Sequence, residues 1–306
     1  MSAQESVRCP SFPQLSVVIA SVHSRAYLMK CLDNIIDQTH DDIEIIVADS
    51  SCSSILDLDN KYPQVRFIKF NEKASLPVLW GAGIRRSSGE IIAITDSSCV
   101  VNVDWVQSIL KAHQSHSPII GGAVENSASK RAVDWAAYFC DYGQFMYPLT
   151  KGAVNVLPGN NISFKRWALE KGREYAFSGE FWKAHWCRKL QDEGIELMSE
   201  PSILVYYTKS YKLIPFLIRR FHHGRCFAGM RVGQTVLSKR AFYALGSIFL
   251  PPVLLYRTMA PILKKRRLLK EFFFSLPIML LAIWFWSIGE MFGYVAGAGR
   301  SCEYIY

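Results

Sequence analysis

The cysteines of this sequence lack the spacing of a metal or redox site. All eight are scattered along 306 residues, without a CxxC pair and without a histidine at ligand spacing. This pattern argues against a zinc site and favours reduced thiols in a cytosolic setting. The cysteines are Cys9, Cys31, Cys52, Cys99, Cys140, Cys187, Cys226 and Cys302.

Signals of secretion and of repeat architecture are also missing. The opening residues, MSAQESVRCPSFPQ, are polar and contain no apolar core of a signal peptide. We find no internal repeat and no low-complexity linker in the sequence. Any attachment to a membrane is therefore expected at the other end of the chain.

The basic residues are concentrated beside the two most hydrophobic stretches of the chain. A formal charge of +9 suits nucleic acid, anionic lipid or phosphorylated substrates. The position of the charges favours a membrane surface, and the sequence has no aromatic and basic motif of a known nucleic-acid-binding module. These basic residues are Arg219, Arg220, Arg225, Arg231, Lys239, Arg240, Lys264, Lys265, Arg266, Arg267 and Lys270.

Two apolar stretches near the C-terminus lie at the lower limit for a membrane span. Residues 241–256 form a run of sixteen, interrupted by Pro251 and Pro252, and residues 272–289 form a run of eighteen. Two spans and an interfacial or re-entrant hairpin agree equally well with the flanking charges. A pair of soluble core helices is the third alternative.

The first hundred residues alternate between β-branched runs and helical periodicity. Apolar residues recur at helical spacing in 24–38 and again near 75–88. At 306 residues, half of them hydrophobic, the chain can bury one large α/β domain and a smaller part. The predicted strands are LSVVIAS (15–21), IEIIVA (43–48), VRFIKF (65–70) and EIIAIT (90–95).

A carboxylate ends two of these strands. Asp49 follows the second strand and Asp96 follows the fourth, and each is followed by serines. In open α/β sheets, ligands bind at the carboxyl ends of the strands. A single aspartate often only ends a strand at a turn, but two at equivalent positions indicate a shared site.

The segment GAGIRRSSG (81–89) begins with GxG, but it lies in a predicted helix before a strand and so does not indicate a dinucleotide-binding loop.

The pattern changes beyond residue 100. A strand is predicted at PIIGGAV (118–124), a turn running into a strand and a helix at LPGNNISFKR (157–166), a helix at 180–194 and a last strand at ILVYY (203–207).

The order of these motifs resembles a known family. LSVVIASVHSRAYLMKCLDNIIDQTHDDIEIIVADSS followed by GEIIAITDSSCVVNVDW is similar to the opening of the family 2 inverting glycosyltransferases, which have the GT-A fold. The resemblance continues through GGAVEN, LPGNNISFKR and LQDEGIEL. GEMFGYVAGAG, near the C-terminus, resembles membrane-associated members that build bacterial polysaccharides.

The resemblance implies an α/β fold with a mostly parallel central sheet, helices on both faces and hydrophobic helices at the C-terminus. It implies a tail over 1–13, a catalytic domain over 14–210, a basic amphipathic interfacial segment over 211–240 and membrane-associated helices over 241–306. The implied partners are a nucleotide diphosphate sugar, a saccharide or lipid-linked acceptor and a membrane, without nucleic acid. The implied location is the inner (cytoplasmic) membrane, with the catalytic domain facing the cytoplasm.

The resemblance also implies a nucleotide site with an incomplete metal motif. In the family, the residue matching Asp49 holds the base and ribose, and a D-x-D motif holds a divalent cation, Mg²⁺ or Mn²⁺, on the diphosphate. Asp96 matches the first acid of that motif, but Ser98 stands in place of the second. Asp104 precedes a helical run and is expected to be its N-cap. The implied nucleotide-sugar contacts are Ala20, Ser21, Asp49, Arg86, Asp96 and Ser98, with Asp96 as the metal ligand.

The residue that would act as general base departs from the family pattern. Inverting transfer needs a carboxylate to deprotonate the acceptor hydroxyl. The family position, counted back from Leu190 and Gly194, holds Trp182 and Lys183. The nearest acid is Glu180, which is the candidate base, with His185 as the reserve candidate.

The segment RRFHHGR (219–225) matches a basic stretch that lies beside the active site in membrane-bound relatives. Arg220 and Arg225 are the expected phosphate donors because a guanidinium binds phosphate bidentately. Attachment to anionic lipid is the alternative. The implied acceptor or diphosphate contacts are Asn160, Asn161, Arg220 and Arg225.

Two functions therefore compete. The first is a membrane-associated glycosyltransferase that moves a sugar from a nucleotide diphosphate sugar to a polysaccharide, glycolipid or lipid-linked acceptor with inversion. The second is a catalytically weakened homologue that acts as a partner subunit in polysaccharide assembly, for which Ser98 and Lys183 argue.

Overall fold

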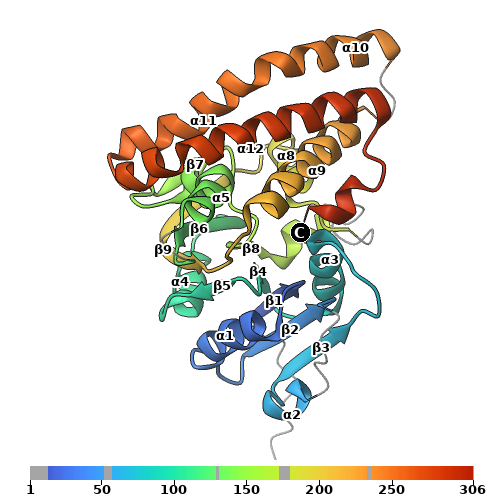
Figure 1. Ribbon diagram of the computed structural model, residues 1–306. Coiled ribbons are helices and arrows are strands. Elements are labelled where there is room, and N and C mark those ends of the chain that lie inside the picture. Colours follow the sequence, from blue (N-terminus) through green and yellow to red (C-terminus); the bar gives the residue numbers. More distant parts are fainter. Residues whose placement is uncertain (1–12, 52–56, 129–130, 172–179, 233–235, 306) are drawn as a thin grey trace, which may run out of the picture.

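The computed structural model describes residues 13–51, 57–128, 131–171, 180–232 and 236–305. A nine-stranded sheet carries helices on both faces, and long C-terminal helices lie across one end of it (Figure 1). The fold class expected from the sequence is confirmed. The expected tail lies outside the described residues except for Pro13, and so do Cys9 and Cys52.

The first half of the chain forms the parallel part of the sheet. β1 pairs in parallel with β2 on one side and β4 on the other, and β2 pairs in parallel with β3. The predicted alternation of strands and helices is confirmed, and the structure adds the short helix α2. The elements are β1 (Leu15–Ser21), α1 (Arg25–Ile36), β2 (Ile43–Asp49), α2 (Leu58–Lys61), β3 (Val65–Lys69), α3 (Leu76–Arg86) and β4 (Ile91–Asp96).

The second half makes the sheet mixed rather than mostly parallel. The strand order is β3-β2-β1-β4-β8-β6-β9-β5, with β7 paired to β9. β8 runs antiparallel to both of its neighbours, β4 and β6. Apolar patterning reports burial and not strand direction, so the sequence could not reveal this reversal. The elements are β5 (Cys99–Val101), α4 (Trp105–Ala112), β6 (Ile119–Asn126), α5 (Ala132–Tyr142), η1 (Gly143–Phe145), β7 (Gly152–Val154), β8 (Ile162–Lys165), α6 (Arg166–Lys171), α8 (Lys183–Asp192) and β9 (Leu197–Tyr207).

Alternate residues of β1 build the two halves of the core. Val17 and Ile19 belong to one buried cluster with α1 and α4, whereas Val18 and Ala20 belong to another with α3, α6 and α8. This two-sided burial explains the continuous apolar runs of the parallel strands. The sheet is therefore a rigid support, and its strand ends are held in fixed register.

Four helices follow the sheet and form a hydrophobic layer (Figure 1). They are α9 (Leu213–Arg231), α10 (Leu237–Gly246), α11 (Leu250–Lys265) and α12 (Leu269–Ala296), with the 3₁₀ turns η2 (Ser247–Phe249) and η3 (Ser301–Tyr304). Two stretches, Ser238–Lys265 and Leu269–Ala296, are long and apolar enough to cross a membrane. Of the most apolar part of each stretch, only 17% is buried in the first and 39% in the second, whereas a soluble core helix is mostly buried.

Helices α9 and α12 cross at glycines. A Cβ added to Gly224 of α9 would lie 2.2 Å from the carbonyl oxygen of Trp286, and one added to Gly289 of α12 would lie 2.1 Å from that of Phe221. Neither position has room for a side chain, because the two backbones are in contact. Small residues permit such close packing in helix pairs within membranes. The crossing fixes the position of α9 over the strand ends.

Candidate functional site

The two strand-end aspartates lie on either side of β1. Asp49 is the register partner of Ser21, and Asp96 is the register partner of Ala20. Neighbouring strands are about 4.8 Å apart, so two spacings place the aspartate backbones about 10 Å apart. The structure therefore brings Ala20, Ser21, Asp49 and Asp96 to one edge of the sheet.

Asp49 holds a turn and keeps one oxygen free. Its Oδ2 accepts hydrogen bonds from the backbone N of Ser51 at 3.3 Å and from the Ser51 hydroxyl at 3.0 Å. Its Oδ1 and the neighbouring hydroxyl of Ser21 are buried without a hydrogen-bond partner among the described residues. Buried polar atoms are nearly always paired, so these two mark a candidate position for a polar ligand.

Asp96 is bound by the serine that replaces the second acid of the motif. Its Oδ1 accepts hydrogen bonds from the backbone N of Ser98 at 2.8 Å and from the Ser98 hydroxyl. Burial raises the pKa of Asp96, and the two hydrogen bonds from Ser98 act in the opposite direction. Ser98 therefore stabilises the ionised form of Asp96 instead of adding a second carboxylate.

A cavity of about 700 Å³ lies between this edge of the sheet and helices α9 to α12. Asp96 and Ser98 line its polar end, whereas Asp49 and Ser21 are not among its lining residues. Its other polar lining residues include His23, Asp141, Asn160, Lys183, His185, Lys209, Arg219, Arg220 and His223.

Two arginines of α9 meet one carboxylate inside this cavity. Asp141, at the end of α5, accepts from Arg219 Nη2 at 2.6 Å and from Arg220 Nη1 at 2.8 Å. The guanidinium of Arg220 lies 4.4 Å from the ring centre of Trp286. Arg219 and Arg220 therefore face the cavity, which favours a role with a phosphate ligand over attachment to the lipid surface.

Lys209 adds a third cation, which sequence reasoning missed. It follows Thr208, whose hydroxyl donates to the carbonyl of Ser98 at 2.8 Å, so Lys209 lies close to Asp96. Burial, and then the charge of Arg219, lower the pKa of Lys209 to about 7. A lysine two residues after the strand predicted at 203–207 was the signal that could have identified it.

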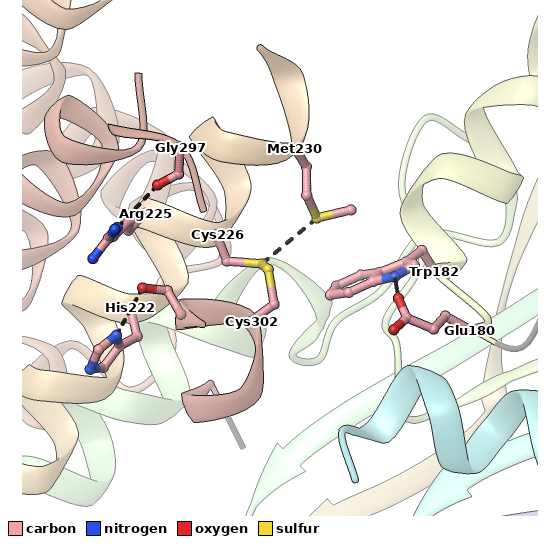
Figure 2. The surroundings of a disulfide bond; sticks show 9 residues. Glu180, Trp182, His222, Arg225, Cys226, Met230, Gly297 and Cys302 are labelled. Carbon is pink, nitrogen blue, oxygen red and sulfur yellow. Dashed lines mark hydrogen bonds between the residues drawn. A yellow bond between two sulfur atoms is a disulfide. The ribbon is translucent and has the colours of Figure 1, made fainter. Parts of the chain in front are cut away.

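The candidate bases lie at the start of α8. Glu180 is exposed, accepts a hydrogen bond from Trp182 Nε1 at 2.5 Å and is not among the cavity-lining residues. Trp182, Lys183 and His185 do line the cavity, and the Lys183 ammonium donates to the carbonyl of Leu157. Figure 2 shows the Glu180–Trp182 pair facing α9.

The two predicted asparagines have different roles. Asn161 accepts from Trp105 Nε1 at 2.9 Å and donates to the carbonyls of Ala123 and Ile203, so its side chain is used within the fold. Asn160 lines the cavity, and its Oδ1 is buried without a partner in the described part of the chain. Only Asn160 is thus positioned to contact a ligand.

Arg86 and Arg225 are not brought to the cavity. Arg86 is exposed at the end of α3, which runs back along the sheet to the edge where the strands begin. Arg225 donates through Nε to the carbonyl of Gly297 at 3.1 Å, as Figure 2 shows. Asp104 stands at the N-cap of α4 as expected, although its side chain makes no capping hydrogen bond.

The expectation that all thiols are reduced is wrong for one pair. Cys226 of α9 and Cys302 of η3 form a disulfide, with their Cα atoms 5.0 Å apart (Figure 2). His222 contacts the hydroxyl of Ser301 at 3.0 Å beside it. The two cysteines are 76 residues apart, and packing of the C-terminus against α9 brings them together, so spacing in the sequence could not reveal the bond.

Within the described ranges, no group of three or more His, Cys, Asp or Glu side chains could hold a metal ion. Asp96 is the only predicted metal ligand, and Ser98 occupies one of its oxygens. A cation at this site would need most of its ligands from the substrate or from water.

Comparisons with known proteins agree with this architecture. The model of a family described as Glycosyl transferase family 2 matches residues 16–172, just over half of the chain. The chain is 27% identical over 138 residues to EpsH of Bacillus subtilis, covering 44% of this chain and 37% of that protein. It is 27% identical over 151 residues to the glycosyltransferase GlyA of Streptococcus pneumoniae, covering 47% and 21%. The chain thus spans well under half the length of either relative.

Solved structures show the same fold at low identity. The mannosyltransferase PcManGT from Pyrobaculum calidifontis, in complex with GDP-Man and Mn²⁺, superposes with a TM-score of 0.57. The match has 16% sequence identity and covers 92% of this chain and 88% of that one. GalNAc-T7 with UDP, GalNAc and Mn²⁺ superposes with a TM-score of 0.51 at 13% identity, covering 67% and 45%.

Proposed function

The chain belongs to glycosyl transferase family 2, and from this we propose that it transfers a sugar from a nucleotide diphosphate sugar to an acceptor, with inversion at the anomeric carbon. One observation carries the proposal. Asp49 and Asp96 flank the end of β1, beside buried polar atoms without partners and a cavity of about 700 Å³. This is the edge at which α/β sheets bind nucleotides.

Each residue at this edge has a proposed task. The free Oδ1 of Asp49 accepts a hydrogen bond from the ribose or base of the nucleotide. Asp96 binds the diphosphate end through a divalent cation, Mg²⁺ or Mn²⁺, which neutralises the charge of the leaving group. Two solved structures of this fold contain Mn²⁺, which supports a cation here. Glu180 deprotonates the acceptor hydroxyl, and His185 is the reserve candidate.

Calorimetric titration with uridine and guanosine diphosphate tests the nucleotide site. We expect the full chain to bind one of them in the presence of Mn²⁺. Asp49→Asn should weaken binding about tenfold to a hundredfold, because a hydrogen bond to a charged group is lost. Asp96→Asn should remove the dependence on Mn²⁺.

Asp59→Asn is the matched control, because Asp59 lies on α2 in an exposed ion pair with Lys69. Its nucleotide affinity should equal that of the wild type. Wild-type protein that binds neither nucleotide, or equal affinities of the wild type and Asp49→Asn, would contradict the proposal.

The acceptor and the location remain parts of the proposal. We place a catalytic domain over 14–210, an interfacial segment over 211–240 and membrane-associated helices over 241–306, on the cytoplasmic side of the inner membrane. The bond between Cys226 and Cys302 departs from the reduced thiols that are usual in that compartment. The acceptor is a polysaccharide, glycolipid or lipid-linked saccharide. The exposed apolar side chains of α10 to α12 support this arrangement, among them Phe242, Phe249, Tyr256, Phe273, Phe274 and Trp284.

Extraction of the full chain with alkaline carbonate tests membrane association. If α11 and α12 enter the hydrocarbon layer, the protein should stay in the membrane pellet, because charge screening and high pH do not weaken apolar burial. Release into the supernatant would instead mean that the helices are held at the surface by charge. The full chain is required, because removing 241–306 would delete α12 and Cys302, which both pack against α9.

A further inference from the structure

The cavity continues well beyond the strand ends into an apolar groove. Its polar end lies at Asp96, and its far end runs between α9, α10, α11 and α12. A nucleotide diphosphate sugar is polar along its whole length, so it does not account for the apolar groove between the helices. The groove is lined by Phe227, Met230, Phe242, Tyr243, Leu250, Val253, Leu254 and Trp286.

Cations gather where the polar part meets the groove. Lys209, Arg219 and Arg220 line this region, and Asp141 is the carboxylate that both arginines contact. Burial and then the charge of Arg219 lower the pKa of Lys209 to about 7, whereas the charge of Asp96, the second carboxylate in this region, acts in the opposite direction. Two guanidinium groups and the amine of Lys209 thus face two carboxylates, one of which is assigned to the diphosphate end of the donor.

The arginines also have unused donors. The Nε atoms of Arg219 and Arg220 are buried without a hydrogen-bond partner among the described residues, and Arg220 is only 6% exposed. Burying a charged group with an unpaired donor is costly unless a ligand pairs with it. A phosphate has several acceptor oxygens and binds guanidinium groups well, so it can pair with donors that the Asp141 carboxylate leaves free.

We propose that the acceptor is a lipid-linked saccharide whose phosphate binds between Arg219 and Arg220, whose hydrocarbon chain occupies the groove, and whose sugar carries the hydroxyl that Glu180 deprotonates. The inference rests on the proposed function, because it names the acceptor of the same site. Val253 of α11 is half-exposed and lines the groove, so the chain can enter from the apolar surface of the helices.

Equilibrium binding of radiolabelled farnesyl phosphate to the full chain, held in amphipol, tests the proposal. Saturable binding is expected, and unlabelled farnesyl phosphate should compete. Farnesol should compete at least about tenfold more weakly, because it lacks the charged head. Inorganic phosphate should compete poorly at the same concentration, because it cannot bury a hydrocarbon chain.

A matched pair of variants on α11 locates the chain. Val253→Trp fills the groove and should weaken farnesyl phosphate binding at least about tenfold, because methylenes of the chain lose their burial. Leu263→Trp is the control, since Leu263 is 40% exposed on the same helix and is not among the groove residues. Its affinity should be unchanged. Nucleotide binding by both variants should equal that of the wild type, which shows that they are folded.

Four results would overturn the inference: no saturable binding, equal competition by inorganic phosphate, equal competition by farnesol, or equal effects of the two tryptophans. Nucleotide titration of the same preparation separates this failure from that of the proposed function. If nucleotide binds and farnesyl phosphate does not, the lipid acceptor alone is wrong. If farnesyl phosphate binds and nucleotide does not, the transferase function is wrong.

Discussion

Replacing Glu180 by glutamine should lower the rate of sugar transfer by a hundredfold to ten-thousandfold, the usual cost of removing a positioned base. Glu180 stands just before α8 and is held by a hydrogen bond from Trp182, whose side chain lines the cavity. Glutamine preserves the size and most of the hydrogen bonding, and it removes only the basic oxygen. Initial rates with a hydroxyl acceptor measure the effect.

Nucleotide affinity provides the internal control for this variant, because the base contacts the acceptor and not the donor. It should be unchanged in Glu180→Gln, and His185→Gln should keep most of its activity. Full activity of Glu180→Gln would transfer the role to His185. A wild type that is inactive with every donor, yet binds nucleotide, would favour the partner-subunit function.

Replacing Lys183 by glutamate, which restores an acid at the family position, would also disturb a contact within the fold. The Lys183 ammonium lines the cavity and donates to the carbonyl of Leu157. In Lys183→Glu, a carboxylate would face that carbonyl with no donor between them. The substitution would therefore cost the turn at Leu157 the hydrogen bond that Lys183 donates to it.

Replacing Asp141 by alanine should destabilise the fold by about 3–5 kcal/mol, the typical cost of leaving a buried charge without its partner. Arg219 and Arg220 both donate to this carboxylate, and all three side chains are largely buried. Chemical denaturation of the purified chain, followed by circular dichroism, measures the change. A loss below about 1 kcal/mol would show that the ion pairs behave as exposed ones do.

Asp59→Asn is the matched comparison. The ion pair of Asp59 with Lys69 is equally short, 2.6 Å, but it is exposed, so its removal should cost at most about 1 kcal/mol. The contribution of Asp141 should also depend on pH. Burial opposes its ionisation, but Arg219 and Arg220 outweigh this and lower its pKa to about 2. The contribution is therefore complete above the unfolded pKa of about 3.9 and is lost as the pH falls through 2.

The strand-end part of the site was predictable because it depends on local pattern. An apolar run ending in aspartate marks a strand end, and parallel pairing brings such ends to one edge, which is how Asp49 and Asp96 were found. Arg86 was expected only from the resemblance, and the strand-end argument does not apply to it, because a helix that returns along the sheet carries its last turn to the opposite edge.

The cation cluster depends on tertiary packing and left little local signal. Asp141 lies near the end of an ordinary amphipathic helix, and Lys209 follows an ordinary strand. They meet the arginines only because α9 lies over the strand ends, where the glycine crossing with α12 fixes it. The sequence shows that Arg219 and Arg220 belong to a basic segment, but it does not show that Asp141 orients them.

The bond between Cys226 and Cys302 gives the C-terminal quarter of the molecule a different topology from the rest. It closes the end of α9, the whole of α10 to α12 and η3 into one covalent ring. A protease that cuts the Arg266–Leu268 turn would leave the two halves joined until a reductant is added. The ring also restricts the unfolded chain, at a benefit of roughly 4 kcal/mol for a loop of this size. The hydrophobic helices α10 to α12 are thus part of a closed covalent loop, so they can separate from α9 only as far as the bond at its base allows.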